Sequence, residues 1–209
     1  MVNDPKQVKK LLQELFIIQG KVKVLPTGVV NVDGTVDLHP GVTLPDHRLP
    51  IKFGHVTGSF SFNLYSNLAT LVGSPDWVGQ TFDCAHTHVG SLVGAPHRVD
   101  GEVDVRFCEL TNFVGGPQQV GRNYWGRRNS ITSLEGLPDH IPGELDFEIS
   151  PGLPILRSLV AEKVVAKRGV MAVNAVNAIL NKYAGKGKKG ALACAAELIK
   201  AGYKEHAKW

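Results

Sequence analysis

The sequence predicts an α+β fold: a short β-solenoid of about six stacked strands, with an N-terminal capping helix and a C-terminal helical segment. Three observations predict it. A motif of about 21 residues recurs four times without gaps, apolar residues alternate after the turn of each motif, and segments with helical periodicity lie at both ends. A unit this short cannot bury its apolar face alone, so neighbouring repeats must stack around a continuous core.

The N-terminal helix is expected over residues 3–19. One apolar stripe at helical spacing is formed there by Val8, Leu11, Leu12, Leu15 and Phe16. Such a helix suits a cap over the first coil, although a helix that docks onto a partner would carry the same stripe. Charged residues interrupt the stretch, and no segment reaches the roughly 18 apolar residues of a membrane span. We therefore expect neither secretion nor a membrane partner.

The repeat is read from four consecutive segments, which start at Leu68, Val89, Leu110 and Ile131. They share the pattern L-x-x-L-x-G-x-P-x-x-V-x-G-x-F, and two looser copies start upstream at Val32 and Val56. Because proline lacks an amide hydrogen and glycine relaxes the backbone, the chain must turn at each G-x-P element. The turn glycines are Gly73, Gly94, Gly115 and Gly136.

Strands follow these turns, because apolar and polar residues alternate there with the period of a half-buried strand. The apolar pairs expected to face the core are Phe60/Phe62, Phe82/Cys84, Val103/Val105 and Leu145/Phe147. The residue between the two members of each pair then lies on the outer face. Stacking places these outer residues in one row: Asp37, Ser61, Asp83, Asp104, Trp125 and Asp146.

This row is the candidate binding surface. Neighbouring strands lie about 4.8 Å apart, so Asp83 and Asp104 are expected side by side, with arginines of the next row close enough to compensate. Trp125 supplies an aromatic anchor, because Trp and Arg dominate interface hot spots. An acidic face favours a basic protein or peptide; a solvated face without a partner and a cation between the carboxylates are the alternatives. The surface comprises Asp83, Asp104, Arg106, Trp125, Arg127 and Asp146.

The C-terminal segment is predicted to be helical and basic. Residues 170–184 and 191–202 have helical spacing and are joined by the linker GKGKKG. Residues 155–209 hold 11 Lys and Arg against 3 Asp and Glu, a net charge of +8, whereas the preceding residues carry −4. Clustered lysines suit salt-dependent contact with a nucleic-acid backbone, or a solvated loop that caps the solenoid. They are Lys186, Lys188 and Lys189.

The chain holds no HExxH, GxSxG or P-loop pattern of the kind that marks catalytic sites. Cys84-Ala-His86-Thr-His88 is the one cluster that resembles a metal or nucleophile site, but the repeat places Cys84 in the core. The three widely spaced cysteines form neither a disulfide framework nor a zinc motif, which is typical of a reducing cytosol. We expect no enzymatic activity, no cofactor and no metal.

The repeat resembles that of the leucine-rich-repeat proteins of unknown function in tailed bacteriophages. Their repeat, LTSLEGAPxxVGGxFDC, is matched by ITSLEGLP, VGSLVGAPHRVDGEVDV and VGQTFDC, and their C-terminal end by residues 153–161 and 190–209. Bacterial type III effectors carry a related repeat, but the closing segment favours phage. Gln80 and Arg122 replace the usual glycine, and Gly126 replaces a core residue, which predicts looser packing there. The resemblance implies a leucine-rich-repeat-like solenoid and a phage origin, but no activity.

Three functions are compatible with the sequence. The leading hypothesis is a non-enzymatic phage protein that binds a host or phage protein through the strand face, in the host cytoplasm during infection, and so modulates a host process. The alternatives are a structural component of the virion and a nucleic-acid-binding protein that uses the basic helices. The expected parts are an N-terminal capping helix (1–25), a repeat solenoid (26–160) and the basic helical segment (161–209).

Overall fold

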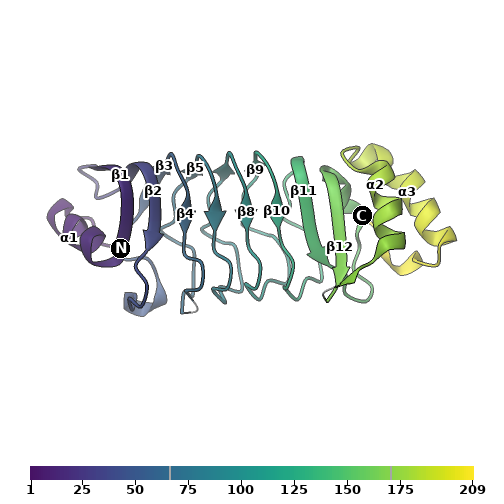
Figure 1. Ribbon diagram of the computed structural model, residues 1–209, viewed down its shortest axis with the longest axis horizontal. Helices are drawn as coiled ribbons and strands as arrows, with labels where there is room; N and C mark the ends of the chain where they lie inside the picture. Colours follow the sequence, from purple (N-terminus) through teal and green to yellow (C-terminus); the bar gives the residue numbers. More distant parts are fainter. Residues whose placement is uncertain (66, 170) are drawn as a thin grey trace.

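Stacked parallel strands form the body of the computed structural model, which describes residues 1–65, 67–169 and 171–209. A helix covers one end of the stack, and two helices cover the other (Figure 1). The predicted fold class, an α+β solenoid with helical ends, is confirmed.

The elements are short in the middle of the chain and longer at its ends. The helices are α1 (Pro5–Leu15), α2 (Asn174–Tyr183) and α3 (Lys188–Lys200), and 3-10 turns span Pro45–His47, Leu156–Val160 and Lys204–His206. The longer strands are β1 (Phe16–Val24), β2 (Val30–Leu38), β3 (Phe53–Val56), β11 (Ile141–Glu148) and β12 (Ala161–Arg168). The two-residue strands are β4 (Phe60–Ser61), β5 (Trp77–Val78), β6 (Phe82–Asp83), β7 (Arg98–Val99), β8 (Val103–Asp104), β9 (Gln119–Val120), β10 (Tyr124–Trp125) and β13 (Met171–Ala172).

Two ladders of parallel strands make up a single wall. The main ladder stacks β2, β4, β6, β8, β10, β11 and β12, which is seven strands in the described residues against about six predicted. The second ladder stacks β3, β5, β7 and β9. Because β2 pairs with β3 through Val30 and Val32 and with β4 through Val36 and Asp37, the two ladders are successive parts of one surface (Figure 1).

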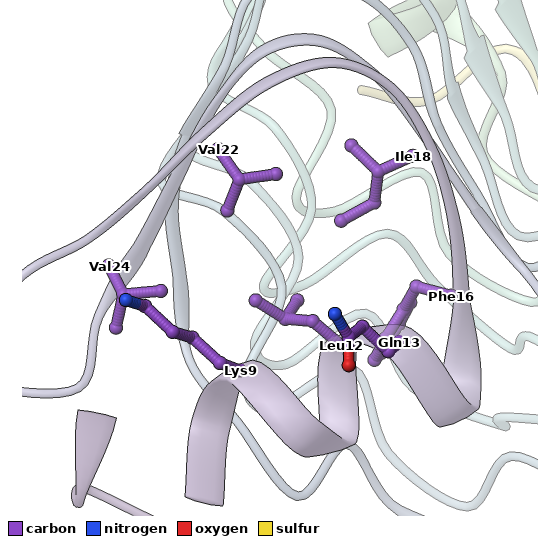
Figure 2. Close-up of a pocket in the computed structure, with 7 residues that line it drawn as sticks. All are labelled: Lys9, Leu12, Gln13, Phe16, Ile18, Val22 and Val24. Atoms are coloured by element: carbon purple, nitrogen blue, oxygen red, sulfur yellow. The ribbon is translucent and has the colours of Figure 1, made fainter. Parts of the chain in front are cut away.

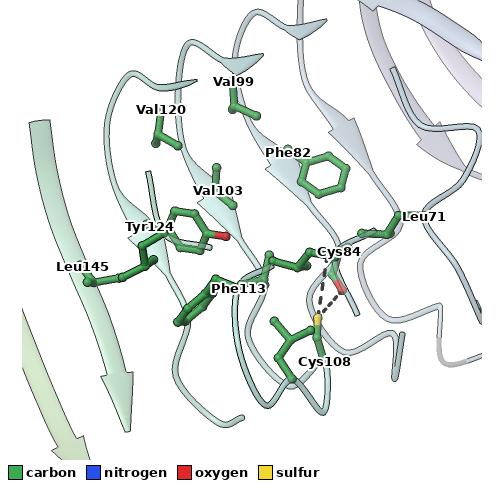
Figure 3. Packing of buried hydrophobic residues seen from close by; sticks show 14 of the residues in the cluster. Leu71, Phe82, Cys84, Val99, Val103, Cys108, Phe113, Val120, Tyr124 and Leu145 are labelled. Atoms are coloured by element: carbon green, nitrogen blue, oxygen red, sulfur yellow. Dashed lines mark hydrogen bonds between the residues drawn. The ribbon is translucent and has the colours of Figure 1, made fainter. Parts of the chain in front are cut away.

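The core runs along the inside of this wall. Phe82, Val103, Tyr124 and Leu145 stack in register from neighbouring strands and are fully buried, as Figure 3 shows for the central coils. Phe113 fills the space beside Tyr124, with the ring centroids 5.4 Å apart at an edge-to-face angle. Every apolar residue of the predicted inward pairs is buried, so the period-2 assignment is confirmed.

The G-x-P turns require glycine because of their backbone conformation. Gly73, Gly94, Gly115 and Gly136 have φ of +107°, +94°, +84° and +90°, a region that residues with a side chain rarely adopt. Successive turns also stack closely: a Cβ on Gly136 would press on the backbone of Phe113 and Val114 in the preceding coil. The motif therefore reflects both the turn and the contact between coils.

The N-terminal helix ends earlier than residue 19, so the expected capping helix over 1–25 is wrong beyond Leu15. Helix α1 begins as its sequence indicates, with Asp4 accepting a hydrogen bond from the Gln7 amide and Pro5 in the first turn. From Phe16 the chain forms β1, which pairs antiparallel with β2. The β-branched Ile17 and Ile18 favour a strand, and Gly20 lies tightly against Gly34 of β2.

The C-terminal part begins with a strand, because β12 pairs in parallel with β11 and extends the solenoid past the expected boundary at residue 160. Two asparagines of helix α2 form hydrogen bonds with backbone groups on the free edge of β12. Asn177 bonds both the amide and the carbonyl of Ala166, at 2.7 and 3.0 Å, and Asn181 does the same at Val164, at 2.9 and 2.7 Å. In the described residues, no helix has the length and apolar content needed to cross a membrane.

Candidate binding surface

The predicted outer row exists in register on the strand wall. Ser61 pairs with Asp83, Asp83 with Asp104, Asp104 with Trp125, and Trp125 with Asp146 across successive parallel strands. We call the outer side chains of β4, β6, β8, β10 and β11, with the residues that flank them, the strand face. The candidate residues assigned to it do lie together.

Two of its carboxylates are not exposed, contrary to the expectation of an acidic surface. Asp104 is 7% exposed and Asp146 1% exposed. The Arg106 guanidinium folds back onto Asp104 two residues earlier, and Arg127 Nε lies 3.5 Å from Asp146 Oδ2. Each arginine neutralises and covers one aspartate, so the acidic row becomes two ion pairs with the guanidinium groups outermost.

Asp83 is held without an arginine. Its Oδ2 accepts a hydrogen bond from Asn63 Nδ2 at 3.0 Å, and its Oδ1 accepts one from the Ala85 amide at 2.9 Å. Burial raises the pKa of the Asp83 carboxyl, and the neighbouring charge of Asp104 adds to the rise. Asp83 and Asp104 therefore lie side by side as predicted, each with its own hydrogen-bond partners.

Trp125 is half-buried near the centre of the strand face. Its Nε1 donates to Glu102 Oε2 at 3.1 Å, and the other oxygen of Glu102 accepts from Asn123 Nδ2 at 2.8 Å. Asn123 Oδ1 accepts from the Glu144 amide at 2.8 Å, which links these residues to the next coil. The indole is thus fixed in orientation by polar contacts, while part of its apolar ring stays accessible.

The buried Asp146 predicts an unusual pH dependence. Burial raises the pKa of Asp146, while hydrogen bonds from the Arg127 and Gly126 amides act in the opposite direction. Because the pKa of Asp146 is higher in the folded protein than in the unfolded chain, the protonated carboxyl stabilises the fold. This stabilisation is complete below the pKa of the unfolded chain, about 3.9, and is lost as pH rises through the pKa of the folded protein. We expect the unfolding free energy of the wild type, minus that of Asp146→Asn, to fall as pH rises through this window. Urea titrations at several pH values measure it, and a difference that grows with pH contradicts the assignment.

In the part of the chain that the structure describes, no group of three or more His, Cys, Asp or Glu side chains is placed to hold a metal ion. Comparison with protein-family models, curated proteins and solved structures finds no match.

A second tryptophan, which is absent from the predicted binding surface, lies on the same wall. Trp77 lies in the second ladder, where its Nε1 donates to Asp100 Oδ2 at 2.8 Å and its ring meets His55 edge-on at 5.8 Å. Arg98 Nε also bonds Asp100, at 2.6 Å, and this contact, with Trp77 contributing, lowers the pKa of Asp100. The repeat could have identified Trp77 as a candidate, because this residue directly precedes the recurring Val position.

The Cys84-Ala-His86-Thr-His88 segment does not form a site. Cys84 is buried, with its sulfur 3.9 Å from Cys108 Sγ (Figure 3). His86 stacks on Phe107 at a centroid distance of 4.1 Å, and His88 Nδ1 lies 2.7 Å from Glu109 Oε1. The three side chains have separate partners.

The basic C-terminal lysines are partly engaged within the molecule. Lys186 Nζ donates to the Lys182 carbonyl at 3.1 Å and lies 5.3 Å from the Tyr183 ring centroid. Lys188 Nζ lies 5.8 Å from the Trp209 ring centroid, and Lys188 and Lys189 form the first turn of α3 rather than a flexible linker. The cluster thus belongs to a folded helical cap.

Proposed function

We propose that this protein binds another protein through the strand face, with Trp125 as the central contact, and that it has no enzymatic activity. The observation that carries the proposal is the half-buried indole, held by Glu102 in the middle of a wall of stacked strands. Trp and Arg are the residues most enriched among interface hot spots, and Arg106 and Arg127 flank this indole in the next row.

The preformed contacts of the strand face favour affinity. Ordering an exposed side chain on binding costs about 0.5–1.5 kcal/mol, and the strand face holds Arg106 and Glu102 in place through hydrogen bonds within the molecule. The ion pairs of Asp104 and Asp146 neutralise two of the carboxylates of this face, whereas Asp83 is bonded to Asn63 and the Ala85 amide. We therefore propose a partner surface of mixed charge with a pocket for an aromatic ring.

The biological setting is proposed from the resemblance of the repeat to phage leucine-rich-repeat proteins. A phage-encoded protein of this kind acts in the host cytoplasm during infection, where a host or phage protein is its partner. The G-x-P turns and the buried alternating residues support a leucine-rich-repeat-like interpretation of the solenoid.

The experiment is a quantitative affinity pull-down from infected host lysate with wild type, Trp125→Ala and Trp77→Ala. Both tryptophans are half-buried on the wall and donate Nε1 to a carboxylate, so Trp77→Ala is a matched control. We expect Trp125→Ala to weaken the interaction by at least about thirtyfold, as for a hot-spot residue, and Trp77→Ala to leave it nearly unchanged. Equal recovery of every partner by wild type and Trp125→Ala contradicts the proposal.

A further inference from the structure

Strand β1 is the N-terminal edge of the sheet, and this edge is open. In the described residues β1 pairs only with β2. Hydrogen bonds from the Leu25 amide to the Val29 carbonyl and from the His39 amide to the Leu15 carbonyl show that odd-numbered residues of β1 face β2. The amides and carbonyls of Ile18, Gly20 and Val22 therefore point away from the sheet.

The opposite end of the sheet is closed by contrast. There β13 and two asparagine side chains of α2 satisfy the free edge of β12. Helix α1 has no such contact with β1 beyond the turn at Phe16, whose amide donates to the Leu12 carbonyl. A long unprotected edge strand is a template for another strand, and soluble proteins usually cover or interrupt it.

An apolar groove lies beside this edge, between α1 and the even-numbered face of β1 (Figure 2). Its volume is about 400 Å³, and its lining consists of Lys9, Leu12, Gln13, Phe16, Ile18, Val22 and Val24. Val22 is 44% exposed although its side chain points into the groove with those of Ile18 and Leu12. Helix α1, at 11 residues, thus leaves apolar surface of β1 uncovered.

The charge around the edge is positive. Lys21 and Lys23 occupy the odd-numbered face of β1, and Lys9 lines the groove on the other side. None of the three has a carboxylate within ion-pair distance among the described residues, although Asp33 is the cross-strand neighbour of Lys21. The Asp33 carboxylate instead accepts a hydrogen bond from Thr57 Oγ1 at 3.0 Å.

We propose that β1 accepts an extended segment of a partner protein as an additional strand, and that this segment alternates apolar and acidic residues. Its backbone would pair with Ile18, Gly20 and Val22. Its apolar side chains would enter the groove, and its acidic side chains would meet Lys21 and Lys23, because successive residues of a strand point to opposite faces. A second copy of this chain fits poorly, since antiparallel pairing of two β1 strands centred on Lys21 or Val22 sets a lysine opposite Lys21.

The test uses a short fluorescein-labelled peptide that alternates Glu and Val, titrated with the full chain and followed by fluorescence polarisation. A peptide alternating Lys and Val and a Glu–Val peptide N-methylated at alternate residues serve as probe controls. We expect saturable binding of the Glu–Val peptide that weakens with salt, and at least about tenfold weaker binding of both controls. Amide hydrogen exchange of Ile18, Gly20 and Val22 is expected to slow when the peptide binds.

Variants separate this edge from the strand face. Val22→Asp, which alters an exposed side chain, and the pair Lys21→Glu with Lys23→Glu are each expected to weaken peptide binding about tenfold, with unchanged far-UV circular dichroism. Trp125→Ala is expected to bind the peptide like wild type. A failure of peptide binding at β1 can therefore be told apart from a failure of protein binding at the strand face. The inference is overturned by no binding up to about 1 mM peptide, by equal binding of the Lys–Val peptide, or by dimerisation through β1 that excludes the peptide.

Discussion

Replacing Gly136 by alanine is expected to destabilise the protein by about 2–5 kcal/mol. The glycine has φ of +90°, where an L-residue costs about 1–2 kcal/mol. A Cβ there also presses on the backbone of Phe113 and Val114, which cannot move without displacing the buried Phe113 ring. Overpacking of this kind adds about 1–3 kcal/mol. Urea unfolding followed by circular dichroism measures the difference.

Gly152→Ala is the matched control. Gly152 also has positive φ, at +72°, but an added Cβ there meets nothing within 4 Å. Only the conformational term remains, so we expect a loss of about 1–2 kcal/mol. If the two substitutions cost the same, the close contact between successive turns is not what makes the G-x-P glycine necessary.

Replacing Asn129 by alanine is expected to cost about 4 kcal/mol. Asn129 is 8% exposed, and its Oδ1 accepts hydrogen bonds from the Cys108 and Leu110 amides at 2.9 and 3.0 Å. Its Nδ2 donates to the carbonyls of Val105 and Gly126 at 2.8 and 2.9 Å. Alanine leaves four backbone groups without this partner, and an unsatisfied buried group costs about 1–3 kcal/mol.

Asn112→Ala provides the comparison for Asn129. Asn112 lies in the same 21-residue repeat, but in an exposed turn, where its Oδ1 accepts the Val114 amide at 2.9 Å and its Nδ2 donates to Thr111 Oγ1 at 3.3 Å. We expect a loss below about 1 kcal/mol, because water replaces the lost contact. A similar loss for both variants means that the Asn129 side chain does not join the two coils as described.

The solenoid was predictable because its repeat encodes both constraints that matter. The G-x-P element specifies where the chain turns, and alternation around Phe82 and Val103 specifies which side is buried. Stacking in register then follows from the constant spacing. The candidate row from Asp83 to Asp146 was predictable for the same reason, since residues at equivalent positions of a repeat must lie beside one another.

The exposure of that row was not predictable from spacing. Asp104 and Asp146 occupy outward positions, yet Arg106 and Arg127 cover them, and long flexible side chains have many conformations that a pattern does not distinguish. The spacing placed arginines nearby but did not predict that they bury the carboxylates. The looser packing expected near Gly126 is wrong, because the buried Phe113 ring fills the space beside this glycine.

Elements outside the repeat were predicted less well. Strand β1 follows α1 without a break, and the apolar stripe of the helix runs into Phe16, so helical spacing extends past the true end of the helix. Strand β12 is preceded by Gly152-Leu153-Pro154, but this G-x-P element lies outside the 21-residue spacing of the four turn motifs. Asn129 makes its bonds to backbone groups, which have no sequence signal of their own.

Photo-crosslinking from the strand face tests the central claim most directly. A photoreactive phenylalanine analogue replaces Trp125 in one protein and Leu192, an 86% exposed residue of α3, in another, and both are irradiated in infected host lysate. The proposed function predicts a discrete protein adduct from position 125 and none of the same mass from position 192. Adducts from position 192 alone, or identical adducts from both positions, contradict binding through the strand face.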